Sequence, residues 1–249
     1  MRLQNWRNFR EAEVGLGARA FIVGPNASGK SNFLDALRFL RDIARPEGGL
    51  ASALAQPGRG GFKGVRCLFA RRPGEMTFEV EIGTDSEPRL WTYSLTLQQH
   101  TRVRGGPVTV ESEIVKRRGD VVDRQDRPKG STDWLLYSQT ILQQVQRSQK
   151  FRDLVEFLTS IRYLHVVPQV VRDARRARIG GEDPFGGDLL SRMKDMPKKS
   201  RGPRLKRIGD ALAIAVPQFG ELDLRDDTQG RPHLYAKFHH WRNNPTEHT

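Results

Sequence analysis

The chain has 249 residues, of which 37% are hydrophobic, enough for the core of one large domain or two small ones. No run of about eighteen apolar residues occurs, and the amino terminus MRLQNWRNFR lacks the apolar middle section of a secretion signal, so we expect a cytoplasmic protein. A single cysteine excludes an internal disulfide, and a formal net charge of +13 favours polyanionic partners, nucleic acid first.

The first predicted elements are a pair of strands followed by a helix. Apolar residues within residues 1–10 indicate one strand, a turn follows near 11–17, and the apolar run 18–23 returns as a second strand. Apolar residues then recur at helical spacing after Ser31, and Pro46 supplies a stop. A helix of about four turns is therefore expected directly after Ser31.

An antiparallel meander is expected in the middle of the chain, after a basic, glycine-rich loop at residues 58–64. Four runs rich in β-branched or aromatic residues are separated by turn formers. These runs are residues 65–70, 76–82, 90–97 and 108–115. Cys67 is expected to be a small buried side chain, and the polar residues 119–133 to be an exposed loop.

The last part of the chain is expected to be largely helical. Residues 134–160 show helical spacing, and 161–167 predict a buried strand ended by Pro168. The remaining predictions are a loop at 172–187, helices at 189–196 and 205–216, and a hairpin formed by 222–225 and 234–238. We place the domain boundary between a lobe at 1–167 and a helical segment with a hairpin at 168–249.

Positive residues gather in four clusters. They lie at residues 71–72, 116–118, 172–178 and 198–207. No aromatic residue is interleaved to stack on a base, and clusters of this kind are most often solvated surface. The net positive charge therefore favours DNA as a partner but does not identify a DNA-binding site. The histidines are isolated from one another or point to opposite faces of a strand, so no metal site is expected among them.

Residues 24–31 read GPNASGKS and match the phosphate-binding pattern G-x-x-x-x-G-K-[ST]. Gly24 and Gly29 let backbone N–H groups approach triphosphate oxygens, because glycine has no Cβ and tolerates positive φ. Lys30 supplies an ammonium for the β and γ phosphates, and the Ser31 hydroxyl is a hard ligand for Mg²⁺. An accidental glycine turn is the alternative, but the apolar run before the motif and the amphipathic helix after it are the context that a phosphate loop requires. The sequence therefore predicts binding of Mg-ATP.

The segment QNWRNF, the loop GPNASGKSNFLDAL and the strand-rich insert resemble the ATP-binding heads of RecF-like and structural-maintenance-of-chromosomes-like (ABC-type) ATPases. The chain looks closest to bacterial AAA-domain proteins related to the overcoming-lysogenization-defect nucleases. The segments IRYLHVVPQVVR and GRPHLYAKFHHW extend this resemblance over most of the chain. It implies an α/β P-loop fold with an antiparallel meander and a helical insert. It also implies an ATPase head that dimerises around ATP and acts with DNA in repair or phage defence.

The resemblance assigns further site residues. In such heads residues near the amino terminus hold the adenosine, and a glutamine between the two lobes joins Mg²⁺ and the attacking water. Phe9 as a plain core residue and Gln169 as a plain turn residue are the competing interpretations. The expected nucleotide-binding residues are Asn8, Phe9, Arg10, Gly24, Pro25, Asn26, Ala27, Ser28, Gly29, Lys30, Ser31 and Asn32. The expected magnesium ligands are Ser31 and Gln169.

The sequence departs from this type of head in one respect. Such heads continue into a signature segment rich in serine and glycine, an apolar strand ending in Asp-Glu and a switch histidine, yet no Asp-Glu pair follows Ser31. Hydrolysis needs a carboxylate to orient magnesium, so we identify no catalytic residue and expect a head that is incomplete at its carboxyl end. A second polypeptide, a truncated product or another strand that closes the sheet each explain this departure.

Three functional hypotheses follow. The first is a DNA-linked ATPase, and the second is a non-catalytic ATP-binding subunit that needs a homodimeric or different partner. A weaker third hypothesis is a nucleic-acid-binding protein with a vestigial P-loop.

Overall fold

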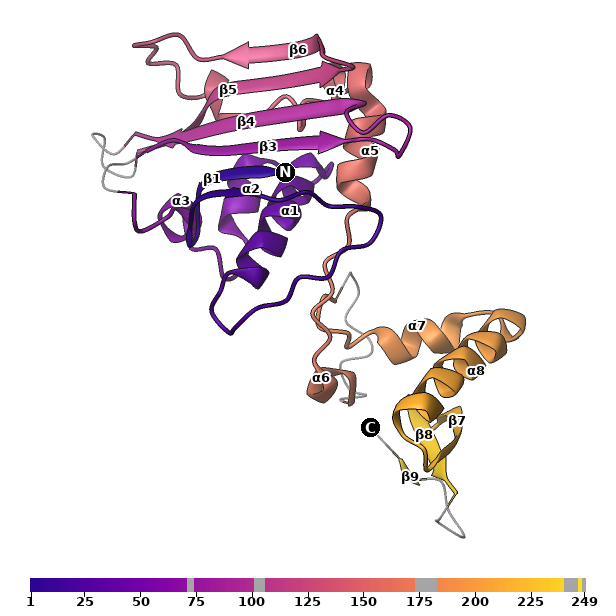
Figure 1. The fold of residues 1–249 in the computed structure, drawn as a ribbon. Coiled ribbons are helices and arrows are strands. Elements are labelled where there is room, and N and C mark those ends of the chain that lie inside the picture. The colour runs from indigo at the N-terminus through magenta and orange to yellow at the C-terminus, as the bar shows by residue number, and fades with distance from the viewer. Residues whose placement is uncertain (71–73, 101–105, 173–182, 240–245, 248–249) are drawn as a thin grey trace. The chain divides into compact units, whose positions relative to one another are not determined.

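The computed structural model describes residues 1–70, 74–100, 106–172, 183–239 and 246–247. It divides into two compact units, Met1–Arg162 and Tyr163–Thr249 (Figure 1). The basic clusters at 71–72 and 173–178 lie outside the described residues. Within those residues, no helix combines the length and the apolar character needed to cross a membrane.

A six-stranded antiparallel sheet forms one layer of the first unit (Figure 1). Its strands are β1 (Arg2–Trp6), β2 (Phe9–Glu13), β3 (Met76–Ile82), β4 (Trp91–Gln99), β5 (Val108–Arg117) and β6 (Asp120–Asp126). Their spatial order is β2-β1-β3-β4-β5-β6. Side chains along β3 and β4 alternate between buried and half-buried, because successive residues of a strand point to opposite faces. One face of the sheet therefore carries the core.

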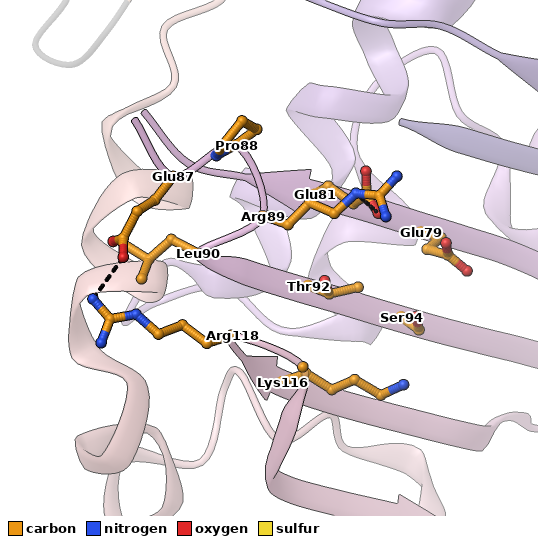
Figure 2. Close-up of a pocket in the computed structure, with 11 residues that line it drawn as sticks. Glu79, Glu81, Glu87, Pro88, Arg89, Leu90, Thr92, Ser94, Lys116 and Arg118 are labelled. Carbon is orange, nitrogen blue, oxygen red and sulfur yellow. Dashed lines mark hydrogen bonds and ion pairs between the residues drawn. The ribbon is translucent and has the colours of Figure 1, made fainter. Parts of the chain in front are cut away.

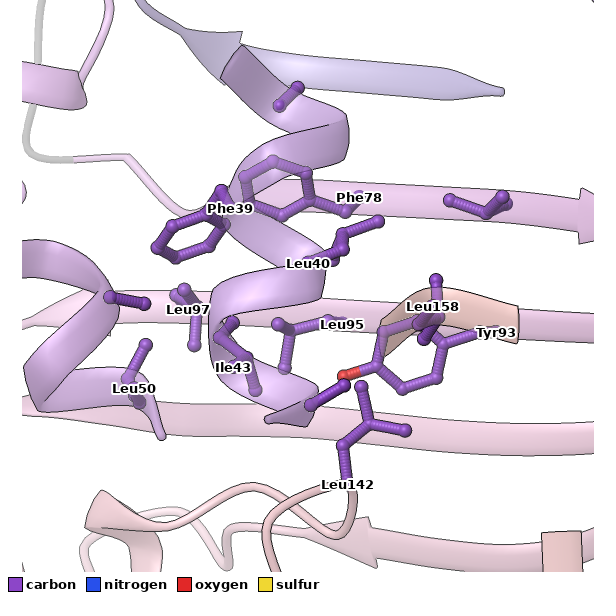
Figure 3. Close-up of a cluster of buried hydrophobic side chains, with 14 of the residues drawn as sticks. Phe39, Leu40, Ile43, Leu50, Phe78, Tyr93, Leu95, Leu97, Leu142 and Leu158 are labelled. Atoms are coloured by element: carbon purple, nitrogen blue, oxygen red, sulfur yellow. The ribbon is translucent and has the colours of Figure 1, made fainter. Parts of the chain in front are cut away.

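The described part of the first unit also contains seven helical segments, several of which cover the buried face of this sheet. They are α1 (Lys30–Ala44), α2 (Leu50–Ala55), α3 (Gly61–Val65), η1 (Leu136–Ser138), α4 (Val145–Ser148), η2 (Gln149–Phe151) and α5 (Arg152–Ser160). The side chains of Trp6, Phe39 and Phe78 meet in pairs with ring centroids 5.2 Å apart, which fixes α1 against β1 and β3. Figure 3 shows this cluster continuing to Leu142 and Leu158.

The amino-terminal prediction is partly wrong. The first strand pairs with β2 through a tight turn at Arg7 and Asn8, rather than with residues 18–23. Residues 18–23 form no strand, and the side chains of Phe21 and Val23 are 84% and 90% exposed. A strand needs a neighbour for its backbone groups, and none of the described strands pairs with this segment. The helix expected after Ser31 is confirmed as α1.

The predicted meander is confirmed for the runs that became β3, β4 and β5. Residues 65–70 are not a strand, because α3 ends at Val65 and only Arg66 bridges to β1, although Cys67 is buried as expected. The loop predicted at 119–133 contains β6, a polar edge strand paired with β5. The helix predicted at 134–160 is broken into short pieces, and only α5 extends beyond two turns.

The second unit contains helices and a small sheet. Its elements are α6 (Pro168–Arg172), α7 (Leu189–Asp195), α8 (Lys198–Ala215), β7 (Phe219–Asp226), β8 (Pro232–Phe238) and β9 (Thr246–Glu247). The hairpin β7–β8 is confirmed, and Asp227 closes its turn by accepting the N–H groups of Gln229 and Arg231 at 2.8 Å each. The strand predicted at 161–167 is wrong, since none of the described strands includes this segment. His165 and Val167 donate to the carbonyls of Pro184 and Phe185, and Leu164 is exposed.

Helix α8 begins earlier than the predicted 205–216. The sequence Gly202-Pro203 argues against a helix, yet both residues lie inside α8. Pro203 lacks the N–H that would donate to the carbonyl of Lys199, so the helix continues through it at the cost of one hydrogen bond.

Candidate functional site

The loop of residues 24–31 leads directly into α1, whose N-cap is Gly29. The first N–H groups of a helix have no partner within the helix, and the positive end of the helix dipole lies beside them. Three turns of α1 are anchored in the core through residues such as Phe33, Phe39 and Ile43, so these donors are held in place. This end of α1 is therefore suited to an anion.

Gly29 occupies a position that admits no side chain. Its φ is +102°, and a Cβ there would lie 2.5 Å from Asn8 Nδ2 and 2.7 Å from Phe9 Cζ. Asn8 is fixed in turn, because Asn32 Nδ2 donates to Asn8 Oδ1 at 2.8 Å and Trp6 Nε1 donates to the carbonyl of Asn32 at 2.7 Å. The β1–β2 turn and the start of α1 thus hold the loop between them.

The side chain of Lys30 folds back into the loop. Its Nζ donates to the carbonyl oxygens of Gly24 and Pro25 at 2.7 and 2.6 Å. Ala27, between these carbonyls and Gly29, has a φ of +64°, an unfavourable backbone conformation for a residue with a Cβ. The loop therefore curves around the ammonium, which can exchange the carbonyl oxygens for phosphate oxygens without leaving the loop.

The loop residues fit a magnesium nucleotide. Asn26 and Ser31 are exposed, and the absence of a Cβ at Gly29 lets the loop lie directly against Asn8 and Phe9. The Ser31 hydroxyl is the group that would bind Mg²⁺, which supplies charge neutralisation to the β and γ phosphates when bound. Among the described residues, no carboxylate forms a hydrogen bond or ion pair with residues 24–31.

A buried ion network lies one turn further along α1. Asp35 accepts from Arg59 Nη2 at 2.8 Å and from Arg7 Nη2 at 3.0 Å. The Arg59 side chain is only 1% exposed and also binds Asp42 at 2.8 Å. Burial acts to raise the pKa of Asp35, but hydrogen bonds and charge from Arg59 and Arg7 outweigh it and lower that pKa. The carboxylate thus ties α1 to the β1–β2 turn that contacts the loop.

These positioning residues are absent from the sequence-based prediction. Asp35 lies outside the apolar stripe of α1 that includes Phe33 and Leu40, so helical spacing gives no signal that its side chain has a buried partner. The partner, Arg59, comes from the glycine-rich loop that precedes α3, and the sequence does not indicate which arginine is buried.

Two other predicted site residues have different surroundings. Arg10 is exposed on β2, two residues from Asn8. Gln169 is exposed on α6 and belongs to the second unit, so its assignment to magnesium stays a prediction. Over the part of the chain that the structure describes, no group of three or more His, Cys, Asp or Glu residues could hold a metal ion. His240 lies outside that part.

An open groove on the outer face of the sheet is a weaker candidate. Figure 2 shows charged side chains of both signs along it, from β3, β5 and the turns between strands. Glu81 pairs with Arg89 at 3.0 Å and Glu87 with Arg118 at 2.7 Å. These opposite charges neutralise each other across the groove. The groove is therefore less suited to binding a charged ligand than the loop at Gly29.

Comparison with known protein families finds a match over most of the chain. The family model described as "AAA domain, putative AbiEii toxin, Type IV TA system" matches residues 19–232, which include the loop and much of the second unit. No curated protein and no solved structure matches the chain.

Proposed function

Because the chain belongs to this AAA-domain family of AbiEii-toxin type, whose domain is a nucleotide-binding P-loop ATPase, we propose that residues 24–31 bind Mg-ATP and that the protein acts with DNA. The observation that carries the proposal is the placement of Lys30, whose ammonium is held inside the loop by the carbonyls of Gly24 and Pro25. The further context, a RecF-like or ABC-type head that works in DNA repair or phage defence, rests on the sequence resemblance.

Each residue of the site has a role in this proposal. The N–H groups at the start of α1 and around Gly29 bind the phosphates, and Lys30 neutralises the β and γ phosphates. Ser31 binds the magnesium ion. Asn8 and Phe9, which contact Gly29, are the residues nearest the loop that could contact the adenosine.

The test compares ATP binding and steady-state hydrolysis by the wild-type chain and by Lys30→Ala. Loss of a charge-assisted phosphate contact should weaken Mg-ATP at least about tenfold and remove any turnover. Lys63→Ala, an exposed lysine on α3, is the matched control and should retain the wild-type affinity. Equal ATP affinity in wild type and Lys30→Ala would contradict the proposal.

A second candidate is a non-catalytic ATP-binding subunit that needs a partner for hydrolysis. The observation that favours it is the exposure of Phe21 and Val23 immediately before the loop. Apolar side chains of a strand-like run are normally covered, so a homodimeric or different partner would pack there. Tight Mg-ATP binding with no turnover supports this candidate, and Lys30-dependent turnover by the pure chain supports the first.

A further inference from the structure

Helix α8 presents a row of cations to solvent in the second unit. Its packed side faces β7, where Leu205, Gly209 and Leu212 are half-buried and Gly209 lies beside the ring of Phe219. The opposite side carries exposed side chains that we call the α8 basic face. Its members are Lys199, Arg204, Lys206 and Arg207.

The charges of the α8 basic face have no acidic partner. In the described part of the chain, the side chains of Lys199, Lys206 and Arg207 make no hydrogen bond or ion pair, and the Arg204 guanidinium contacts only the sulfur of Met196 at 3.6 Å. Some exposed arginines of the first unit do have an acidic partner. Arg118, for example, pairs with Glu87 at 2.7 Å. One acid, the exposed Asp210, lies one turn beyond Lys206 and Arg207 without pairing with them, so the face keeps an excess of positive charge.

Helix stability does not account for this arrangement. The first turn of α8 contains lysines and no acidic residue, and cations at the positive end of a helix destabilise it by about 0.3–1 kcal/mol each. Gly202 and Pro203, both poor helix formers, lie between Lys199 and Arg204. The first acid of the helix, Asp210, comes only after Arg207. Binding of an anion would remove this electrostatic cost.

We infer that the α8 basic face binds the phosphate backbone of duplex DNA. This inference rests on the DNA-linked part of the proposed function and names the surface involved. Lys199 and Arg207 are separated by about 12 Å along the helix axis, similar to the width of the DNA major groove of about 12 Å. Cations spread over that length and around the exposed side of one helix can reach phosphates on both edges of the groove.

Other nucleic acids fit this surface less well. No aromatic residue occurs between Lys198 and Val216, so the face cannot stack on the bases of a single strand. The deep, narrow major groove of duplex RNA does not admit side chains in this way. The helix also has no asparagine or glutamine to read adenine, which indicates binding of phosphates with little sequence preference.

The experiment measures fluorescence anisotropy of a labelled DNA duplex with the full chain over a series of salt concentrations. The test variant combines Lys199→Ala, Arg204→Ala, Lys206→Ala and Arg207→Ala. A matched control variant removes four exposed cations of the first unit, combining Lys63→Ala, Lys129→Ala, Lys150→Ala and Arg152→Ala. Both variants lose the same net charge, and far-UV circular dichroism and Mg-ATP binding check that each is folded.

The wild-type chain should bind the duplex with a steep dependence of log K on log salt. The test variant should reduce that slope by about 3 to 4, because each released phosphate contact contributes about 0.9, and should weaken binding at least about tenfold at low salt. The control variant should retain most of the slope and the affinity.

Three results would overturn the inference. An equal loss in both variants would show that only overall charge matters, although DNA binding itself would stand. Equally tight, α8-dependent binding of a single strand would contradict the choice of duplex. Absence of duplex binding by the wild-type chain would refute both the DNA-binding role of the α8 basic face and the DNA-linked part of the proposed function. Mg-ATP binding at Lys30 would still be decided by its own test.

Discussion

At the scale of single residues, Glu113 on β5 is a carboxyl group buried inside the first unit. Burial raises its pKa to about 7, even though Tyr93 and the N–H groups of Ile141 and Leu142 donate hydrogen bonds that favour the charged form. Its Oε2 accepts from Ile141 N at 2.6 Å, so the side chain holds the segment after β6 against the sheet. Burial also raises the pKa of Tyr93 well above its usual value.

The position of Glu113 predicts a pH-dependent stability. Its pKa in the unfolded chain is 4.5, so the folded protein binds the proton more tightly. The resulting stabilisation is complete below about pH 4.5 and is lost as the pH rises through 7, a change of roughly 3 kcal/mol at most. The free energy of unfolding of the first unit, measured with urea, should therefore decrease between pH 5 and pH 8 by an amount on the order of 3 kcal/mol. Glu113→Gln should flatten this slope.

The control for this prediction is Glu156→Gln, which changes an exposed carboxylate on α5. It should keep the wild-type slope between those two pH values. A Glu113→Gln variant whose stability falls with pH as steeply as that of the wild type would show that another group causes the dependence.

At the scale of elements, α8 forms although several of its residues have low helix propensity. Its interior glycines each cost about 1 kcal/mol relative to alanine. A Cβ on Gly209 would lie 3.6 Å from Phe219 Cε1, an ordinary van der Waals distance, whereas a Cβ on Gly202 would meet nothing within 4 Å. Neither glycine has a positive φ, so both positions accept alanine.

Gly209→Ala should therefore stabilise the second unit by about 1 kcal/mol or slightly more, by combining higher helix propensity with a contact to Phe219. Gly202→Ala separates the two effects, because it gains propensity alone. Urea unfolding followed by circular dichroism measures both. Destabilisation by Gly209→Ala would mean that α8 packs more closely on β7 than the structure shows.

The elements also show which parts of the fold the sequence can predict. The runs at 76–82, 90–97 and 108–115 alternate in polarity, and this local pattern alone is enough to identify β3, β4 and β5. The strand β6 is polar on both sides because it lies at the edge of the sheet, so its sequence resembles a loop. The strand prediction for residues 18–23 is wrong for a different reason. This run is apolar, but an apolar run forms a strand only where a neighbouring strand pairs with it.

The same limit applies to the candidate site. The loop at 24–31 is recognisable because its chemistry depends on adjacent residues. The contact of Asn8 with Asn32 and the pairing of Asp35 with Arg59 join residues 24 positions apart, and no local pattern encodes them. These contacts form only in the folded chain, where β1, α1 and the loop before α3 lie together.

At the scale of the whole molecule, the described chain contains two cores of unequal size. The buried cluster of the first unit runs from Leu3 to Leu158 and joins the sheet to α1, α2 and α5. In the second unit, the buried apolar side chains among the described residues are Leu190, Met193, Phe219, Pro232 and Ala236. A small core stabilises a unit only weakly, so the second unit should unfold first.

This difference predicts two thermal transitions, of which Mg-ATP raises only the upper one. In a Trp241→Phe background the remaining tryptophans, Trp6, Trp91 and Trp134, all belong to the first unit, so their fluorescence reports its unfolding while circular dichroism reports both units. Nucleotide at about one hundred times its Kd should add roughly 2.7 kcal/mol to the unit that binds it. The tryptophan transition should therefore move upward with Mg-ATP and stay in place in Lys30→Ala, while the lower transition stays in place in both. A single transition seen identically by both probes would mean that the two cores unfold as one cooperative structure.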